Sequence, residues 1–146
     1  MELFLVEDDD DDIETVVRMA ARSRLDIRVT TATTADEAME HLSRRRTELR
    51  RGGARAPDVV LLDLNLPATP GMDLLRWLKE DDRLREIPVV IVSGGDDDRA
   101  IEQGRELGAH SHIRKPITLQ SLTWIVTAVR NYRSRLAKLP SASSEA

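Results

Sequence analysis

Short apolar runs alternate with longer amphipathic segments along the chain, and the alternation repeats five times. Each run ends at polar residues, which is typical of a strand buried on both faces of a parallel sheet. The expected strands cover residues 3–6, 27–31, 59–62, 89–92 and 111–114. A strand followed by a helix, five times over, predicts an α/β fold. We expect a doubly wound five-stranded parallel sheet with helices on both faces and right-handed crossovers.

The amphipathic segments carry apolar side chains at helical spacing, so each is expected to form a helix with one face on the sheet. We expect the aspartates before Ile13 to cap the first helix and Thr34 to begin the second. The five apolar stripes are formed by Ile13, Val16, Val17 and Ala20; Ala35, Ala38, Met39 and Leu42; Leu74, Leu75 and Leu78; Ile101, Gly104 and Leu107; and Leu119, Leu122, Val126, Val129 and Leu136.

Two segments lie outside this pattern. Residues 43–57 are polar and basic. They include six arginines and the pair Gly52-Gly53. We interpret this segment as a solvated helix end and a surface loop, and a contact with an anion or a partner is the alternative. Residues 140–146 are expected to form a short disordered tail, which leaves residues 1–139 as one domain.

The composition narrows the function classes. The chain has 146 residues, a formal net charge of −4 and 3% aromatic residues, which does not favour binding to nucleic acid or to anionic membranes. It has no cysteine, so disulfides, thiolate metal sites and thiol catalysis are excluded. We find no apolar run long enough to span a membrane and no secretory signal segment, and we therefore expect a cytoplasmic protein.

Residues able to do chemistry directly follow four of the five expected strands. They are Glu7 and Asp8 after the first strand, Asp63 after the third, Ser93 after the fourth and Lys115 after the fifth. In a doubly wound sheet the ligand site lies beyond the carboxyl ends of the strands. We therefore expect three carboxylates, one hydroxyl and one ammonium group to meet at one edge of the sheet.

Three adjacent carboxylates repel one another unless one is protonated or a cation is bound. Oxygen ligands without cysteine or paired histidine favour Mg²⁺, with Mn²⁺ as an alternative, over Zn²⁺. Because Mg²⁺ in proteins is often shared with phosphate oxygens, the site suits a phosphoryl ligand. Asp63 is then the candidate nucleophile that forms an aspartyl phosphate. Lys115 and Ser93 are candidates for binding the other phosphoryl oxygens.

Taken singly, each of these residues has a simpler explanation. An acid at a strand end is often only a helix cap, and we expect the acidic run from Asp10 onward to face solvent. A single serine or lysine after a strand carries little information. The joint placement of all five residues after four strands is what indicates a functional site.

Four motifs resemble those of receiver domains from two-component response regulators. They are Leu5-Val6-Glu7-Asp8-Asp9, Leu62-Asp63-Leu64-Asn65-Leu66-Pro67 with Gly71, Val92-Ser93-Gly94, and Lys115-Pro116. The resemblance implies the flavodoxin-like receiver fold and a signalling protein that accepts a phosphoryl group from a sensor histidine kinase. It implies no enzyme activity beyond the protein's own phosphorylation and dephosphorylation.

The resemblance also implies a role for each matching residue. Asp63 matches the phosphoacceptor, Asp8 a direct metal ligand, Glu7 a ligand acting through water, Asn65 a ligand through its backbone carbonyl, Ser93 the switch hydroxyl, and Lys115 the phosphate-binding lysine before a cis-proline. One position departs from the family, because its switch aromatic falls at His112. That histidine either takes part in switching or is a surface residue with no special role.

Two features are similar to stand-alone regulators of phytochrome-type histidine kinases: the arginine-rich segment before Pro57 and the ending from Tyr132 to Pro140. Such regulators are implied to be homodimers through the fourth helix, the fifth strand and the fifth helix. Trp124 lies off the apolar stripe of the last helix, so it either supports that interface or packs at the core margin. We find no linker to a second domain and expect signalling by conformational change without an output domain.

Other functions are weighed against this one. The protein is alternatively an intermediate carrier in a multistep phosphorelay, which the sequence does not distinguish from an end point. A haloacid-dehalogenase-type phosphohydrolase also uses an aspartate nucleophile and Mg²⁺, but it needs a second aspartate where Asn65 stands. A non-phosphorylated receiver-like module would lack the acids or the lysine. No residues remain for a helix-turn-helix that binds DNA.

Overall fold

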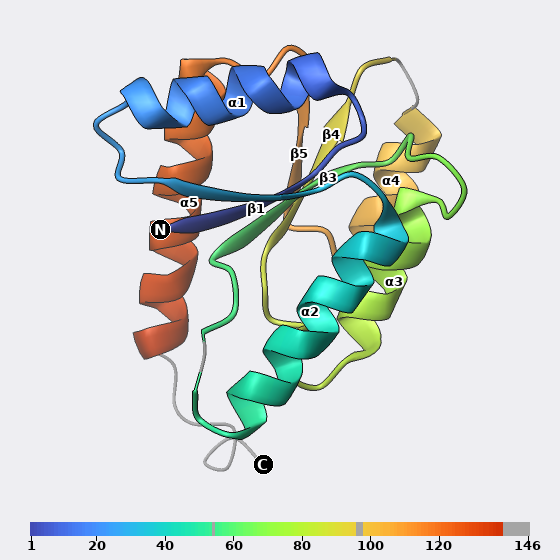
Figure 1. Ribbon diagram of the computed structural model, residues 1–146, viewed down its shortest axis with the longest axis vertical. Helices are drawn as coiled ribbons and strands as arrows, with labels where there is room; N and C mark the ends of the chain where they lie inside the picture. Colours follow the sequence, from blue (N-terminus) through green and yellow to red (C-terminus); the bar gives the residue numbers. More distant parts are fainter. Residues whose placement is uncertain (54, 96–97, 139–146) are drawn as a thin grey trace.

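The computed structural model describes residues 1–53, 55–95 and 98–138, and for residues 135–138 it describes the backbone alone (Figure 1). The tail expected at residues 140–146 lies outside the described residues, as does the side chain of Leu136, and both expectations stay predictions.

Five parallel strands form one sheet in the order β2-β1-β3-β4-β5. The strands are β1 (Glu2–Val6), β2 (Arg28–Ala32), β3 (Val59–Asp63), β4 (Val89–Ser93) and β5 (Ser111–Arg114). A helix follows each of them: α1 (Asp10–Arg22), α2 (Ala35–Arg50), α3 (Gly71–Glu80), α4 (Asp98–Glu106) and α5 (Leu119–Lys138). The predicted α/β fold is confirmed, and each expected strand lies within one residue of the observed one at both ends.

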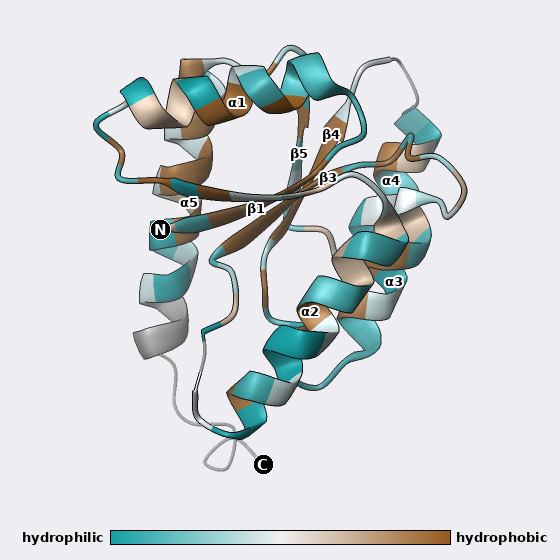
Figure 2. Ribbon diagram, in the orientation of Figure 1, coloured by the Kyte–Doolittle hydropathy of each residue, from teal (hydrophilic) through white to brown (hydrophobic). Residues whose placement is uncertain are grey.

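The core lies in two layers because neighbouring side chains of a strand point to opposite faces of the sheet. Phe4, Val6 and Leu62 pack with α2 and α3 on one face. Leu3 and Leu5 pack with α1 and α5 on the other. Figure 1 shows α1 and α5 on one side of the sheet and α2, α3 and α4 on the other, and Figure 2 shows the apolar residues concentrated along the strands between them.

The first two helices begin where the sequence predicts. The Asp9 carboxylate accepts hydrogen bonds from the backbone N–H groups of Asp11 and Asp12 at 2.9 and 3.0 Å. The hydroxyl of Thr34 accepts one from the backbone N–H of Glu37 at 3.0 Å. Each cap satisfies N–H groups that have no partner inside the helix.

The basic segment contains the expected helix end and loop, but two of its arginines are not simply solvated. Helix α2 continues to Arg50, and two of its arginines make long-range ion pairs. Arg45 contacts the buried carboxylate of Glu2, and Arg46 contacts the half-buried carboxylate of Asp81. Their guanidinium groups therefore tie α2 to the start of the sheet and to the end of α3. In the described part of the chain, no helix is long and apolar enough to cross a membrane.

Candidate functional site

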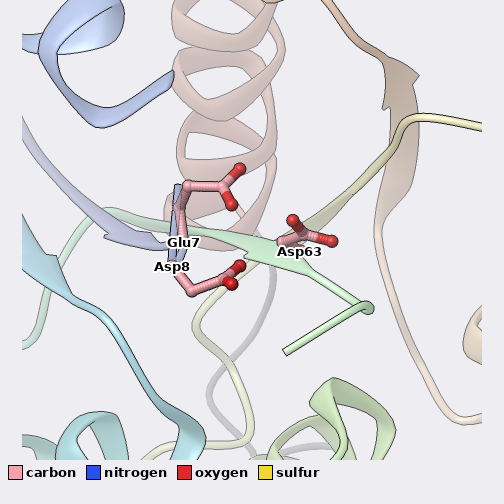
Figure 3. Close-up of side chains that lie close together, drawn as sticks. All are labelled: Glu7, Asp8 and Asp63. Atoms are coloured by element: carbon pink, nitrogen blue, oxygen red, sulfur yellow. The ribbon is translucent and has the colours of Figure 1, made fainter. Parts of the chain in front are cut away.

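Acids at the carboxyl ends of β1 and β3 meet at one edge of the sheet. Val6 pairs with Leu62 in parallel register, which brings the adjacent Glu7 and Asp63 side by side. The carboxylates of Glu7, Asp8 and Asp63 each offer an oxygen, and these oxygens lie within 4.8 Å of one another (Figure 3). Glu7 and Asp63 are buried, whereas Asp8 is exposed. The cluster is thus open to solvent on the side of Asp8.

Lys115 follows β5 and reaches into this cluster. Its ammonium nitrogen lies 2.7 Å from Glu7 Oε1, 3.0 Å from Asp63 Oδ2 and 2.9 Å from Asp12 Oδ2. Burial of the ammonium acts to lower the pKa of Lys115, but the hydrogen bonds to these three carboxylates outweigh it and raise the pKa above its ordinary value. Lys115 is therefore a fixed positive charge at the site.

The cluster holds more negative charge than the lysine compensates. Burial raises the pKa of Glu7 to about 7, because the neighbouring Asp63 adds to the burial effect and the hydrogen bond to Lys115 opposes it only in part. A divalent cation beside these oxygens would remove the conflict. The hard oxygen donors present, with no sulfur or nitrogen donor among them, fit Mg²⁺ or Mn²⁺.

The carboxylate of Asp63 is held in place by its own loop. The backbone N–H of Asn65 donates to Asp63 Oδ1 at 2.8 Å, and Asp63 Oδ2 accepts from Lys115. The start of α3 packs closely behind this turn. A Cβ atom on Gly71 would lie 2.6 Å from the backbone oxygen of Asp63, so this position requires glycine.

Ser93 supplies a hydroxyl without a partner at the end of β4. It is buried, and within the described part of the chain its Oγ makes no hydrogen bond. Leaving a buried hydroxyl unpaired costs free energy unless a ligand or water meets it. The Ser93 carbonyl accepts a hydrogen bond from the Lys115 backbone N–H at 2.8 Å, which fixes the two residues next to each other. A phosphoryl oxygen bound near Lys115 would give the hydroxyl its missing partner.

His112 lies in the middle of β5, opposite Ile91 of β4. It is half-buried and borders a small gap with Ile101 and Arg105 of α4. Ser93 pairs with Arg114, two residues further along β5, so Ser93 and His112 stand on the same face of the sheet as α4. The histidine thus occupies the space between the sheet and α4, rather than an open surface.

The structure brings the five residues predicted from the strand ends together, and it adds one that the sequence analysis placed in solvent. Asp12 belongs to the first turn of α1, and its carboxylate contacts Lys115. The expectation that the acidic run faces solvent holds for Asp10 and Asp11, whereas Asp12 contacts Lys115 although 42% of its side chain remains exposed. A signal was present, because Asp12 lies one helical turn before the buried Val16 and so on the inner face of α1. The peptide bond between Lys115 and Pro116 is cis, as the resemblance implied.

Comparison with known proteins shows the protein family to which the chain belongs. The family model of the response regulator receiver domain matches residues 3–127, so the chain belongs to this family. It is therefore the receiver domain of a response regulator, a signalling protein of two-component systems.

Three response regulators are similar to this chain in sequence or in structure. The polar-differentiation response regulator DivK of Brucella anthropi is 43% identical over 67 residues, which is 43% of this chain and 51% of that protein. The chain thus matches about half the length of this curated relative. The phosphorylated cyanobacterial phytochrome response regulator RcpA is similar at 34% identity and a TM-score of 0.69, covering 96% of this chain and 98% of that one. The Mn²⁺-bound response regulator Rcp1 is 25% identical with a TM-score of 0.70, covering 96% and 99%.

Proposed function

We propose that this receiver domain accepts a phosphoryl group on Asp63 from a sensor histidine kinase in a reaction that requires Mg²⁺. The observation that supports this best is the convergence of a buried carboxylate, an ammonium group 3.0 Å away and an unpartnered buried hydroxyl. A carboxylate supplies the nucleophile, while the ammonium and the hydroxyl match the oxygens of a transferred phosphoryl group. RcpA, whose structure is of the phosphorylated form, is a relative over nearly the whole chain.

In this proposal Asp8 and Asp63 bind the cation directly, Glu7 binds it through water, and Asn65 contributes its backbone carbonyl. The cation would neutralise the acids and the incoming phosphoryl oxygens, which is the chemistry that Mg²⁺ provides in phosphoryl transfer. Mn²⁺ is an alternative ion because both ions prefer oxygen ligands, and the related Rcp1 is known in a Mn²⁺-bound form.

The chain's own residues carry the transfer step. An Asp63 carboxylate oxygen attacks phosphorus, an oxygen–phosphorus bond forms, and the bond to the donor's nitrogen breaks. Lys115 and the Ser93 hydroxyl bind the other phosphoryl oxygens and stabilise the charge that they carry. The product is an aspartyl phosphate on the protein itself. The chain is thus a phosphoacceptor that promotes only its own phosphorylation and dephosphorylation.

The signal then passes from Ser93 to the surface of α4. Phosphorylation adds about −1.5 to −2 charge at Asp63, and the unpartnered Ser93 hydroxyl can turn toward it. His112, between the sheet and α4, is the residue whose environment changes next. Amide chemical shifts around His112 should therefore move on phosphorylation or on binding a beryllofluoride mimic, and unchanged shifts would contradict this coupling.

The central test is phosphorylation of the purified protein. Incubation with acetyl phosphate and Mg²⁺ should add one phosphoryl group, measured by intact mass, and chelation of Mg²⁺ should prevent it. Asp63→Asn should add none, whereas Asp73→Asn on the exposed face of α3 should behave as wild type. Full labelling of the Asp63→Asn protein would refute the assignment of the acceptor.

The donor is proposed to be a phytochrome-type histidine kinase in the cytoplasm, which the similarity to RcpA supports. Phosphotransfer profiling against the kinases of the source organism tests this. An alternative is an intermediate carrier in a phosphorelay, and this role would show as rapid transfer from phosphorylated Asp63 to a histidine phosphotransfer protein.

We also propose a homodimer through α4, β5 and α5, carried by residues 1–139 as one domain. Trp124 on α5 is 49% exposed, which favours an interface residue over the core margin. The charged rim is partly engaged within the chain, because Arg133 pairs with Asp58 and Glu102 with Arg105. Sedimentation should show a dimer at micromolar concentration that Trp124→Glu shifts toward monomer, and a monomeric wild type would remove the proposal.

A further inference from the structure

Asp12, in the first turn of α1, contacts the ammonium of Lys115. The first turn of α1 carries three aspartates, Asp10, Asp11 and Asp12, which differ in their surroundings. Asp12 Oδ2 lies 2.9 Å from Lys115 Nζ, whereas Asp10 and Asp11 are exposed. Asp12 therefore approaches the lysine from a helix, whereas Glu7 and Asp63 lie at the carboxyl ends of strands β1 and β3.

The packing of α1 places Asp12 within reach of Lys115, although 42% of the Asp12 side chain is exposed. Asp12 and Val16 stand one helical turn apart, and Val16 is buried against the sheet. Val16 also packs in the same cluster as Ile117, which follows Lys115 and Pro116. Asp12, Lys115 and Ile117 line one small cavity of about 80 Å³. The turn of α1 that carries Asp12 is therefore held against the same core cluster as the residue that follows Lys115-Pro116.

An ammonium group has three N–H donors, and in this structure three carboxylates receive them: Glu7, Asp63 and Asp12. Glu7 and Asp63 belong to the acid cluster that fits a cation, and Asp63 is the proposed acceptor. Their contacts with Lys115 must change when a cation and a phosphoryl group arrive. Asp12 lies outside that cluster, so its contact is the one that the reaction leaves intact.

We infer that Asp12 is a positioning residue that anchors the Lys115 ammonium beside Asp63 during phosphoryl transfer. This inference rests on the proposed function of Asp63. A long lysine side chain loses several rotatable degrees of freedom when it is fixed, and an anchor that fixes it beforehand removes that cost from the transfer step. The anchor acts through Lys115 and touches neither the donor nor the reacting atoms.

The test compares Asp12→Asn with Asp11→Asn, which removes the same charge from the same turn. At saturating acetyl phosphate and Mg²⁺, Asp12→Asn should slow phosphorylation about three- to tenfold, whereas Asp11→Asn should change it less than about twofold. Asp12→Glu should restore part of the rate. Mg²⁺ affinity should be nearly the same in all variants, because Asp12 is not in the cation cluster.

A double-mutant cycle separates positioning from a general structural role. In a Lys115→Ala background, Asp12→Asn should have no further effect on the rate, because the group that it anchors is gone. In the absence of any phosphodonor, the Lys115 amine should be acylated faster by a small reagent in Asp12→Asn than in Asp11→Asn, measured by peptide mass spectrometry. This second readout applies even where the Lys115→Ala protein is too slow to time.

The possible outcomes are distinct. A wild-type protein that takes up no phosphoryl group would overturn the proposed function itself. A phosphorylated wild type with equal rates in Asp12→Asn and Asp11→Asn, or with a faster Asp12→Asn, would overturn the anchoring role alone. An Asp12→Asn effect that persists in full without Lys115 would do the same, because it would show that Asp12 acts by another route.

Discussion

Strand β1 has a buried glutamate near each end, and the two behave in opposite ways. Glu7 follows the carboxyl end and Glu2 begins the amino end, with 1% and 6% of their surfaces exposed. The pKa of Glu7 is raised to about 7, whereas the pKa of Glu2 is lowered. Burial alone would raise both pKa values. The difference therefore comes from the partners that each end of the sheet provides.

At the amino end each acid has cations and donors of its own. Burial acts to raise the pKa of Glu2, but hydrogen bonds from Arg45 and Thr30 outweigh it. Arg28 adds a longer contact of 3.7 Å. At the carboxyl end, Glu7, Asp63 and Asp12 all depend on Lys115. One end of the sheet thus satisfies its buried charges, while the other keeps an excess of negative charge.

The two ends of the sheet therefore differ in their capacity to bind a ligand. A satisfied network stabilises the folded chain but has no remaining capacity for a ligand. The acid cluster and the unpartnered Ser93 hydroxyl lower stability and gain from a cation and a phosphoryl group. Clusters that violate the usual rules of burial are expected at functional sites. The two ends differ in this way although the same strands form both.

The largest expected effect is at the satisfied end. Arg45→Met removes the main partner of Glu2 and leaves a buried charge poorly compensated, so it should lower the free energy of unfolding by about 2 kcal/mol. Arg44→Met is the matched control, because the Arg44 side chain is 66% exposed and pairs with an exposed Glu40. That control should cost less than about 0.5 kcal/mol. Urea denaturation measures both, and equal losses would show that the Glu2 network has no special weight.

The second prediction concerns the binding of Mg²⁺ to the acid cluster at the carboxyl end of the sheet. Mg²⁺ at ten times its dissociation constant should raise the free energy of unfolding by about 1.4 kcal/mol, since it binds the folded state alone. Asp8→Ala should abolish most of this gain, whereas Asp10→Ala, on the exposed side of α1, should preserve it. Thermal denaturation with and without Mg²⁺ gives the result. Equal behaviour of the two variants would mean that the cluster does not bind the ion.

The third prediction is the pH dependence of the metal-free protein. The pKa of Glu7 is higher in the folded chain, about 7, than its ordinary value of 4.5. Folding therefore takes up a proton between these values, so the stability that Glu7 contributes is present below about pH 4.5 and is lost as the pH rises to about 7. Glu7→Gln cannot titrate, and at pH 8 it should be more stable than wild type by about 1 kcal/mol.

That difference should shrink as the pH falls toward 5, and saturating Mg²⁺ should reverse it because the cation favours the ionised acid. The readout is the difference between the two proteins at each pH, which cancels the titration of groups such as His41, whose pKa is lowered by burial and by nearby arginines. A Glu7→Gln protein that is less stable than wild type at pH 8 without metal would contradict the excess of negative charge inferred for this cluster.

The strands and most of the candidate site could be predicted from the sequence, because both depend on short local patterns. The strands are apolar runs, and parallel pairing places whatever follows them at one edge, so Glu7, Asp63, Ser93 and Lys115 were predicted together. The Glu2–Arg45 pair was not predicted, because its members are 43 residues apart and α2 must first be placed on the sheet. The helical spacing of the sequence nevertheless indicated both contacts. Arg45 continues the inward stripe of Ala38 and Leu42, as Asp12 precedes that of Val16.

Other features depend on side-chain geometry that no pattern encodes. That the Asn65 N–H orients Asp63, and that Ser93 lacks a partner, follow from the placement of single atoms. The position of His112 between the sheet and α4 required the register of β4 and β5. The role of His112 could not be predicted from the sequence, because a histidine on a half-buried strand is equally consistent with a surface position.

The smallest expected effect is at the outer margin of the satisfied end, where Arg133 of α5 pairs with Asp58. Arg133 is 45% exposed, so this pair is accessible to solvent and ions. Arg133→Gln should lower the free energy of unfolding by about 0.5 kcal/mol in dilute buffer. Asp58 keeps a second role, because its Oδ2 accepts a hydrogen bond from the backbone N–H of Glu2 at 2.6 Å, and this bond does not require the arginine.

In 1 M NaCl, where the Debye length is about 3 Å, the loss from Arg133→Gln should nearly vanish. The loss from Arg45→Met should persist, because salt screens a buried pair far less. Denaturation of both variants at low and high salt measures the contrast, and an Arg133→Gln loss that is large and unaffected by salt would place this pair within the buried network instead of at its margin.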